Sequence, residues 1–239
     1  MLFRQLFDQD TGTYTYLIAD EASRSAVLVD PVIEQLERDL RLLKELGLKL
    51  KYCLETHVHA DHITGTARLR ELTGCTGVVP EGAPAGCADY FIKDGEVLRV
   101  SAVTIKAIAT PGHTDSHMAY QVGDDRVLTG DALLIRGCGR TDFQSGNAAQ
   151  LYDSITQKLY SLPDETLVYP AHDYHGNTVS TIGEEKAWNP RTHGRDRQGF
   201  ADFMNSQNFP YPAKIMEALP ANERCGNVAA AAITETRYT

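Results

Sequence analysis

Four side chains able to bind a metal lie within six residues of the chain. The stretch at 55–65 reads Glu-Thr-His-Val-His-Ala-Asp-His-Ile-Thr-Gly and carries His57, His59, Asp61 and His62. Imidazole and carboxylate groups bind zinc and iron, and burying several of them together without a cation is costly. The run 48–54 before them has strand length, and the apolar spacing over 63–74 after them favours a helix. We therefore predict a metal site where a strand ends and a helix begins.

Further polar side chains stand at the exits of other apolar runs. They are His113, shortly after VTIKAIA, Asp131, at the end of RVLTGD, and His172, at the end of TLVYPAH. Buried polar groups need partners, so this repeated placement is hard to explain as core filling. Asp30 ends SAVLVD in the same way and is interpreted as a residue that orients a ligand. We expect all of them to join the histidine stretch in one site.

The remaining chain alternates between strand-like and helix-like segments. Residues 13–20 and 25–32 flank a polar turn and predict an antiparallel hairpin, followed by an amphipathic helix over 34–46. Short apolar runs follow the histidine stretch, and an amphipathic helix is predicted over 148–162. Two rounds of strands followed by helices indicate an α/β (α+β) protein. Its two sheets are predicted to pack face to face with helices outside, as a four-layer αββα sandwich.

The predicted elements end near residue 175. From about Gly176 onward the chain becomes polar and irregular, with several prolines. We expect a single structural domain, with a core over 1–175 and an appendage over 176–239 that covers the substrate site. The tail beyond about Cys225 is expected to be frayed.

Charge and cysteine usage restrict the partners and the compartment. A formal net charge of −9 argues against nucleic acid or an anionic membrane surface as a partner. No apolar run approaches the ~20 residues of a membrane helix, and the N-terminal run lacks the pattern of a signal or transit peptide. The five cysteines form no Cys-x-x-Cys motif, which suits reduced thiols in a cytoplasmic protein.

The polar strand exits fall in short motifs that resemble those of the metallo-β-lactamase superfamily. In order they are THVHADH at 56–62, PGHT at 111–114, GDAL at 130–133 and PAHDY at 170–174. The superfamily fold is the four-layer sandwich inferred above, and the resemblance covers roughly 10–175. Within the superfamily, the chain most resembles the persulfide dioxygenases (the ethylmalonic-encephalopathy-type sulfur dioxygenases), through ETHVHADHITG, TPGHTDSHMAY, TGDALLIRGCGRTDFQSG, HDYHG and WNPR.

The resemblance implies one Fe(II) per chain, held by His57, His113 and Asp131. Two imidazoles and a carboxylate leave positions open for dioxygen and a substrate sulfur, and redox-silent zinc cannot couple the two. The remaining residues of the set would then orient ligands and solvent; they are His59, Asp61, His62, His172 and Asp30. Hydrolases of the superfamily use the same seven histidines and aspartates, without Asp30, for two metals bridged by Asp131. The sequence therefore leaves one metal or two open.

The implied activity is a glutathione-dependent persulfide dioxygenase that converts glutathione persulfide, O₂ and water to sulfite and glutathione. Arg140 and Arg191 match family positions that bind glutathione, and a guanidinium suits a carboxylate. Thr114 and Tyr174 match positions beside the metal. Cys138, between two glycines, is either a reactive thiol or a small residue in a tight turn, and the second reading is favoured. The family also implies a homodimer.

The alternative is a glyoxalase II-like hydroxyacylglutathione thioester hydrolase with a binuclear metal site. That family usually has Phe-Glu-Gly after its Gly-Cys-Gly turn, whereas this chain continues Arg-Thr-Asp-Phe-Gln over 140–144. The appendage is also shorter than the helical substrate domain of glyoxalase II. Both departures favour the dioxygenase. A third reading, a metal-binding protein without turnover, is disfavoured because the open-site ligands are intact.

Overall fold

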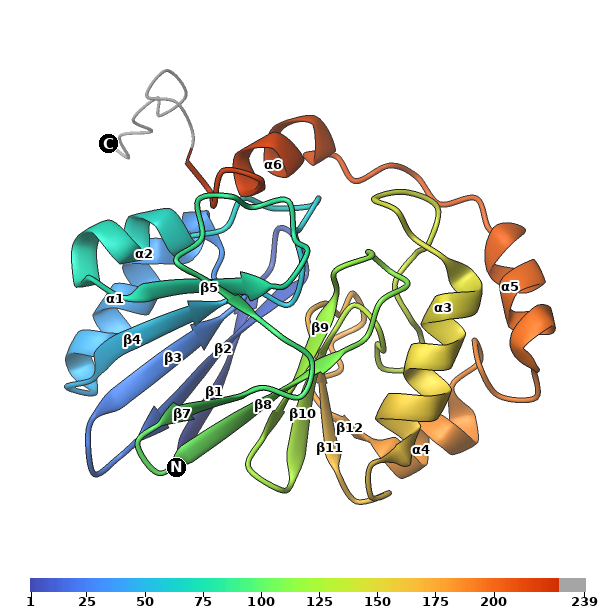
Figure 1. Cartoon of the computed structure of the whole chain (residues 1–239), viewed down its shortest axis with the longest axis horizontal. Coiled ribbons are helices and arrows are strands. Elements are labelled where there is room, and N and C mark those ends of the chain that lie inside the picture. The colour runs from blue at the N-terminus through green and yellow to red at the C-terminus, as the bar shows by residue number, and fades with distance from the viewer. Residues whose placement is uncertain (228–239) are drawn as a thin grey trace.

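Two six-stranded sheets packed face to face form the middle of the molecule (Figure 1). The structure is a computed structural model and describes residues 1–227. The first sheet has the order β1 (Leu2–Asp8), β2 (Thr13–Asp20), β3 (Ser25–Val29), β4 (Lys49–Leu54), β5 (Thr76–Pro80) and β6 (Tyr90–Ile92). The second has the order β12 (Ser180–Thr181), β11 (Leu167–Pro170), β10 (Arg126–Gly130), β9 (Met118–Val122), β8 (Val103–Ala109) and β7 (Val97–Val100).

Helices cover the outer face of each sheet (Figure 1). On the first sheet lie α1 (Leu36–Glu45), preceded by the 3₁₀ turn η1 (Ile33–Gln35), and α2 (Thr66–Thr73). On the second lie α3 (Ala148–Asp153), which continues through η2 (Ser154–Lys158) and η3 (Leu159–Ser161), then α4 (Ile182–Trp188) and α5 (Arg197–Asn205). The predicted four-layer αββα sandwich is therefore confirmed. A sixth helix, α6 (Ile215–Asn222), crosses one end of the sandwich (Figure 1).

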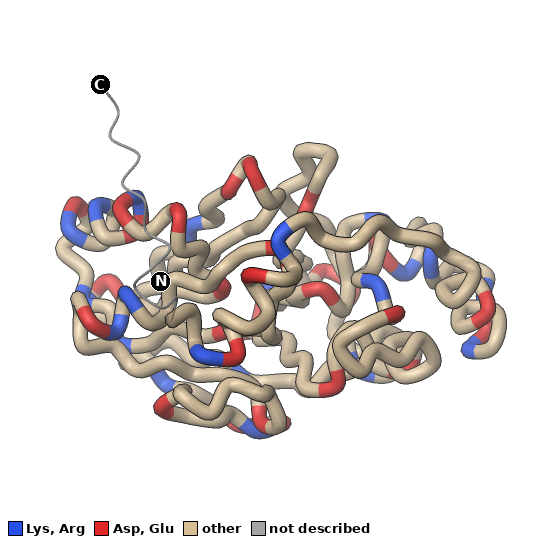
Figure 2. Tube along the Cα trace, turned by 90° about the horizontal axis from the view of Figure 1, so that it is seen from above, with Lys and Arg blue, Asp and Glu red and all other residues tan. Residues whose placement is uncertain are grey.

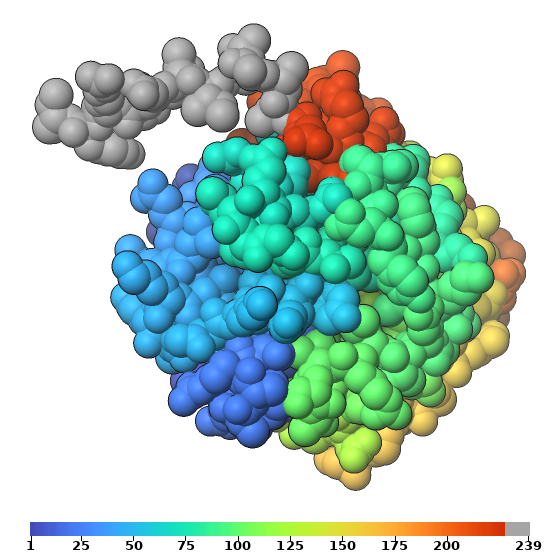
Figure 3. Space-filling model, turned by 60° about the vertical axis from the view of Figure 1, so that its left-hand side comes forward, coloured from blue at the N-terminus to red at the C-terminus, as the bar shows by residue number. Residues whose placement is uncertain are grey.

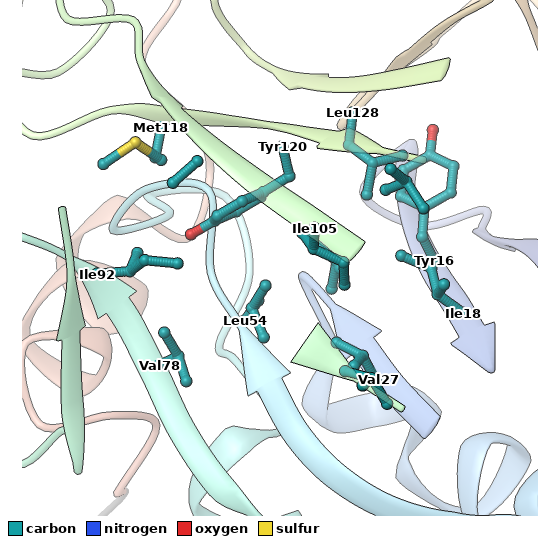
Figure 4. Packing of buried hydrophobic residues seen from close by; sticks show 14 of the residues in the cluster. Tyr16, Ile18, Val27, Leu54, Val78, Ile92, Ile105, Met118, Tyr120 and Leu128 are labelled. Carbon is teal, nitrogen blue, oxygen red and sulfur yellow. The ribbon is translucent and has the colours of Figure 1, made fainter. Parts of the chain in front are cut away.

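Alternating side chains of each central strand serve two cores. In β2, Tyr16 and Ile18 enter the core between the sheets, whereas Leu17 packs under the helices of the first sheet. Figure 4 shows the residues of the inter-sheet core, among them Leu54 and Tyr120 from opposite sheets. Full burial of one such side chain contributes about 1.5–3 kcal/mol. Because both faces are covered, these strands are apolar almost throughout, which is why sequence alone could locate them.

Three strands missing from the sequence prediction have a weak apolar pattern, and the three helices α4, α5 and α6 (Ile215–Asn222) lie in the stretch that was expected to be irregular. β1 pairs antiparallel with β2 from Leu2↔Ala19 to Asp8↔Thr13, but most of its side chains are exposed or half-buried. β6 has three residues and β12 has two, which is too short to show the alternation of apolar and polar residues that identifies a strand in a sequence. The helix predicted over 148–162 starts at Ala148, after the N-cap Asn147, and widens into the π turn η2.

The chain beyond residue 175 contributes to two parts of the molecule. β12 pairs with β11, and Ile182 and Phe200, in or near α4 and α5, are buried against the second sheet. The segment 206–227, which includes α6, then passes over the end of the sandwich where the histidine stretch lies. Most of the tail predicted to be frayed, residues 228–239, lies outside the described residues. Among residues 1–227, no helix is long and apolar enough to cross a membrane.

The cysteines only partly follow the prediction of reduced thiols. Cys53, Cys75 and Cys138 are free and buried. The prediction is wrong for Cys87 and Cys225, which form a disulfide across a sequence separation of 138 residues. Sequence spacing could not reveal this pair, because the fold alone brings the loop after β5 against the end of α6.

Candidate metal centre

The histidine stretch forms a loop between β4 and α2. The sequence favours a helix over 63–74, but α2 begins only at Thr66, so the whole stretch over 55–65 is loop. An antiparallel bridge between Val32 and Thr64 lies just before the helix. Gly74 ends α2 in the left-handed conformation, with φ of 70°, as its place after the apolar spacing predicted.

One group of possible ligands comprises His57, His113 and Asp131. One ligand atom from each lies within 4.8 Å of the others. His57 Nδ1 lies 2.9 Å from the hydroxyl of Thr56, and His113 Nδ1 lies 2.7 Å from the carbonyl of Arg140. These contacts occupy Nδ1 in both rings and leave Nε2 for a metal, as is usual for metal-binding histidines.

Charge and protonation also fit a cation at this group. Burial, together with the neighbouring histidines, lowers the pKa of His57 well below its ordinary value, so its ring is neutral and keeps a lone pair. Hydrogen bonds to Thr56 fix the loop behind it, because Asp30 accepts from both the backbone N–H (2.7 Å) and the hydroxyl (2.9 Å) of that residue. Asp30 therefore contacts the loop directly behind a candidate ligand, and its role as an orienting residue stays a prediction.

Asp131 is held from two sides. Its backbone N–H donates to His117 Nε2 at 3.0 Å, and its carboxylate lies 2.7 Å from His172 Nδ1. Burial lowers the pKa of His117 to about 3, so this ring is neutral and can accept. The sequence prediction missed His117. Its position four residues after His113, in PGHTDSH, is the signal that could have found it.

A second group comprises His59, Asp61, His62 and His172, also within 4.8 Å. Here the side chains bind one another. His172 Nε2 lies 2.9 Å from Asp61, so both nitrogens of His172 face carboxylates. Burial lowers the pKa of His172, but Asp131 and Asp61 outweigh burial and raise it well above its ordinary value. An imidazolium that donates to two carboxylates is the form that these contacts favour. His62 Nε2 is buried without a hydrogen-bond partner within residues 1–227, so this group also offers a free ligand atom.

A third group lies behind His59. His59 Nε2 lies 3.1 Å from Asp30, and Glu55 stands 3.8 Å away on the same side. Burial raises the pKa of Glu55 to about 7, and its Oε1 accepts hydrogen bonds from Thr64 and Thr66. The sequence prediction missed Glu55, although it begins the quoted histidine stretch.

A cavity of about 840 Å³ opens onto His57, His113 and Asp131. Four of the five predicted substrate residues line it: Cys138, Arg140, Tyr174 and Arg191. The segment 209–214, just before α6, forms another part of the wall. Thr114 is placed differently. It is buried outside this lining, and its hydroxyl has no partner among the described residues.

The two arginines differ in their freedom to bind an anion. Arg140 is tied to Asp142 through two hydrogen bonds of 2.7 Å and donates to the carbonyl of Pro210 at 2.6 Å. It thus joins the metal-site loop to the segment 209–214. The guanidinium of Arg191 makes a single hydrogen bond within residues 1–227, a long one of 3.4 Å to Gln207, and it stacks on Phe203. Of the two guanidinium groups, that of Arg191 keeps more donors for a ligand.

Cys138 lies in a turn that touches the metal group. Burial raises the pKa of Cys138 to about 12, which keeps the thiol protonated. A Cβ at Gly139 would lie 2.4 Å from the carbonyl oxygen of Asp131 and 2.7 Å from His113 Nδ1. This close approach requires glycine at position 139.

Comparison with known proteins agrees with the geometry. Residues 9–172 match the metallo-β-lactamase superfamily. The mitochondrial persulfide dioxygenase ETHE1 of Homo sapiens is 49% identical over 228 residues, which cover 95% of this chain and 89% of that protein. The crystal structure of ETHE1 from Myxococcus xanthus superposes with a TM-score of 0.93 at 55% identity, covering 95% of this chain and 100% of that chain.

A hydrolase shows a weaker similarity. The hydroxyacylglutathione hydrolase of Methylococcus capsulatus (strain ATCC 33009 / NCIMB 11132 / Bath) is 36% identical over 164 residues, covering 67% of this chain and 62% of that protein. The dioxygenases match at higher identity and over nearly the whole chain. The ordered motifs of the superfamily meet at one end of the sandwich, and the chain belongs to the metallo-β-lactamase superfamily and, within it, to the persulfide dioxygenase family.

Proposed function

We propose that this protein is a glutathione-dependent persulfide dioxygenase with one Fe(II) per chain, held by His57, His113 and Asp131. The observation that carries the proposal is the group of His57, His113 and Asp131, whose ligand atoms lie within 4.8 Å of one another at the cavity. It stands in a chain that is 49% identical to a persulfide dioxygenase over 95% of its length. His172, which a two-metal site would use as a ligand, belongs to the second group and lies within hydrogen-bond distance of Asp131 and Asp61. Two imidazoles and one carboxylate form the donor set of non-haem Fe(II) oxygenases.

The proposed reaction takes glutathione persulfide, O₂ and water to glutathione and sulfite. Bound iron would supply the one-electron and O₂ chemistry. His172 Nδ1 contacts the carboxylate of Asp131 and holds it in place, and the carbonyl of Arg140 holds the ring of His113. These contacts fix the donor atoms before any ligand arrives, which is how neighbouring groups tune metal sites.

The cavity supplies the remaining parts of a glutathione site. It is large enough for a tripeptide, since binding cavities usually measure ~300–1,000 Å³. We propose that Arg191 binds a glutathione carboxylate and that Tyr174, beside His172, borders the sulfur end. Arg140 keeps its proposed role at the same site, where it would exchange its contact with Asp142 for a substrate carboxylate.

The alternative, a binuclear thioester hydrolase, is supported by one observation. The second group keeps a complete ligand set, and His62 Nε2 is free to bind a metal. If both ligand groups held a metal, the pair would supply a hydroxide nucleophile for hydrolysis instead of O₂ chemistry.

Two further proposals concern the context of the enzyme. The homodimer implied by the family stays a prediction, to be checked by light scattering. A cytoplasmic location also stays a prediction. It is weakened because the similar human protein carries "mitochondrial" in its name and because two of the expected thiols form a disulfide. Figure 2 shows acidic and basic residues interspersed along the chain, which is in keeping with a small-molecule substrate rather than nucleic acid.

The decisive experiment measures metal content and oxygen uptake on one preparation made without chelators. We expect about one iron per chain, oxygen uptake with glutathione persulfide, and sulfite as the product. Asp131→Ala should lose both iron and uptake. The hydrolase would be the better conclusion if the protein held two zinc ions per chain, hydrolysed hydroxyacylglutathione and took up no oxygen.

A further inference from the structure

The backbone of the histidine loop is held by partners outside the loop. Tyr120 donates its hydroxyl to the carbonyl of Glu55 at 2.8 Å, and Gln144 donates to the carbonyl of Val58 at 2.8 Å. A loop without regular pairing relies on such contacts, because buried backbone groups left unpaired are costly. The position of the metal-binding side chains therefore depends on residues far away in the sequence.

Asn222, at the end of α6, makes the largest contribution from a single side chain. Its amide nitrogen donates to the carbonyls of His59 (2.9 Å) and His62 (2.7 Å). Its oxygen accepts from the backbone N–H of Thr64 at 2.9 Å. Asn222 is 4% exposed, so the three hydrogen bonds are shielded from water. One amide thus connects three backbone positions on either side of Asp61, the first of them two residues after His57, and only an amide of this length offers two donors and an acceptor there.

The chain around Asn222 is itself fixed to the core. Cys225 forms the disulfide with Cys87, and its carbonyl accepts from the N–H of Ala67, in the first turn of α2, at 3.1 Å. Gly226 packs so closely that a Cβ there would lie 2.1 Å from the carbonyl oxygen of Thr64. In Figure 3 the surface of this C-terminal segment, in red, rests on that of the teal residues. Backbone, disulfide and close packing together leave Asn222 little freedom.

We infer that Asn222 is a positioning residue of the metal centre, and that the Cys87–Cys225 disulfide keeps it in place. The inference rests on the metal site of the proposed function, but not on the reaction. Loss of an orienting partner typically lowers metal affinity about 10–100-fold. The same loss should alter the ligand geometry, which a purely structural contact far from the site would not do.

The test uses the full chain, stripped of metal and titrated with Co²⁺ in competition with a chelator. Asn222→Ala should bind Co²⁺ about 10–100-fold more weakly and show a changed visible absorption spectrum of the bound ion, at a temperature well below its Tm. The matched control is Asn205→Ala. Asn205 is exposed at the end of α5, in the same part of the chain, and its loss should change neither quantity.

A second variant covers the case in which Asn222→Ala does not fold. Cys87 is only partly buried, and Cys87→Ser removes the disulfide while Asn222 remains. We expect a smaller loss of Co²⁺ affinity, toward the lower end of the same range, and a spectrum shifted in the same direction.

The outcomes separate this inference from the proposed function. A soluble Asn222→Ala variant with a lower Tm, but with wild-type Co²⁺ affinity and spectrum, would show that Asn222 is merely structural. If that variant is insoluble, wild-type affinity and spectrum in Cys87→Ser overturn the inference. Oxygen uptake by the wild-type iron protein is measured independently. If the wild-type iron protein takes up no oxygen, the proposed dioxygenase activity is wrong, but the positioning role of Asn222 is unaffected.

Discussion

At the scale of single residues, the metal centre depends on what each ring nitrogen contacts. His57 and His113 use Nδ1 for a hydrogen bond and keep Nε2 free, whereas His172 gives both nitrogens to carboxylates. His62 is intermediate, because its Nδ1 faces Asp61 at 2.9 Å and its Nε2 has no hydrogen-bond partner in the described part of the chain. His62 is therefore the residue whose removal best distinguishes one metal from two.

We predict that His62→Ala retains close to one iron per chain. Oxygen uptake should still fall by about 10–100-fold, because Asp61 loses a partner and no longer holds His172 as firmly. Metal analysis and oxygen uptake on the same preparation check this. The comparison is Asp131→Ala, which should lose the iron. Loss of one metal out of two in His62→Ala would contradict the single site.

Arg191 provides the residue-scale test of the substrate. If it binds a glutathione carboxylate, Arg191→Ala should raise KM about 10- to 150-fold, which corresponds to the ~1.5–3 kcal/mol of a hydrogen bond to a charged group. The effect should be confined to KM if the contact is equal in ground and transition states. Arg195→Ala is the matched control, because Arg195 also stacks on Phe203 but lies outside the cavity lining. Equal KM values in the two variants would mean that the glutathione carboxylate does not bind at Arg191.

At the scale of elements, the turn over residues 137–139 is built to touch the metal group. The carbonyl of Asp131 accepts from the N–H of Gly139 at 2.7 Å, and the backbone of the next residue, Arg140, accepts from His113. A side chain at 139 would push both ligands, whereas one at Gly137 would meet only Leu134 Cβ at 3.6 Å.

We predict that Gly139→Ala loses most of its metal affinity, while Gly137→Ala keeps it. A Cβ contact of 2.4 Å with backbone can be relieved only by moving the turn or Asp131. Iron content after dialysis against a weak chelator distinguishes the two variants, with circular dichroism as a check of folding. Similar iron content in the two variants would mean that the turn over 137–139 can shift to accommodate a Cβ without displacing the metal ligands.

The elements and the site were predictable to different degrees. Strands buried on both faces, such as the one ending at Val29, have a continuous apolar run, and ligands at strand exits form short motifs. The half-exposed β1 has no such run. Partners brought in by the fold, such as Asn222 or the disulfide between Cys87 and Cys225, have no local pattern at all. His117 lay within a quoted motif, and its pairing with Asp131 depends on tertiary contact.

At the scale of the whole molecule, net charge and buried charge act differently on stability. The chain carries a formal net charge of −9, and salt screens charges that are exposed to solvent. Asp39, in the first turn of α1, is 1% exposed. One of its oxygens accepts from Arg38 Nε at 2.8 Å, and the other is buried without a partner among residues 1–227. Burial, opposed by Arg38, raises the pKa of Asp39 to about 6.

This raised pKa makes Asp39 a pH-dependent cost to the stability of the fold. The folded protein binds the proton more tightly than the unfolded chain, whose pKa is ~3.9. Below about pH 4 the carboxyl is neutral in both states and costs nothing. As the pH rises through about 6 the folded state must bury a charge, and the loss reaches at most about 3 kcal/mol.

We predict that Asp39→Asn raises the free energy of unfolding at pH 7.5 and that most of this gain disappears at pH 4.5. The gain should differ by about 1–2 kcal/mol between the two pH values, because the amide never has to be charged. Urea unfolding of wild type and variant at both values measures it, and comparing the two proteins cancels every other titrating group. Asp124→Asn, at an exposed turn position, should show no such difference. A gain independent of pH, or a variant less stable than wild type at pH 7.5, would mean that Asp39 is stabilised as a carboxylate by Arg38 and the helix N-terminus.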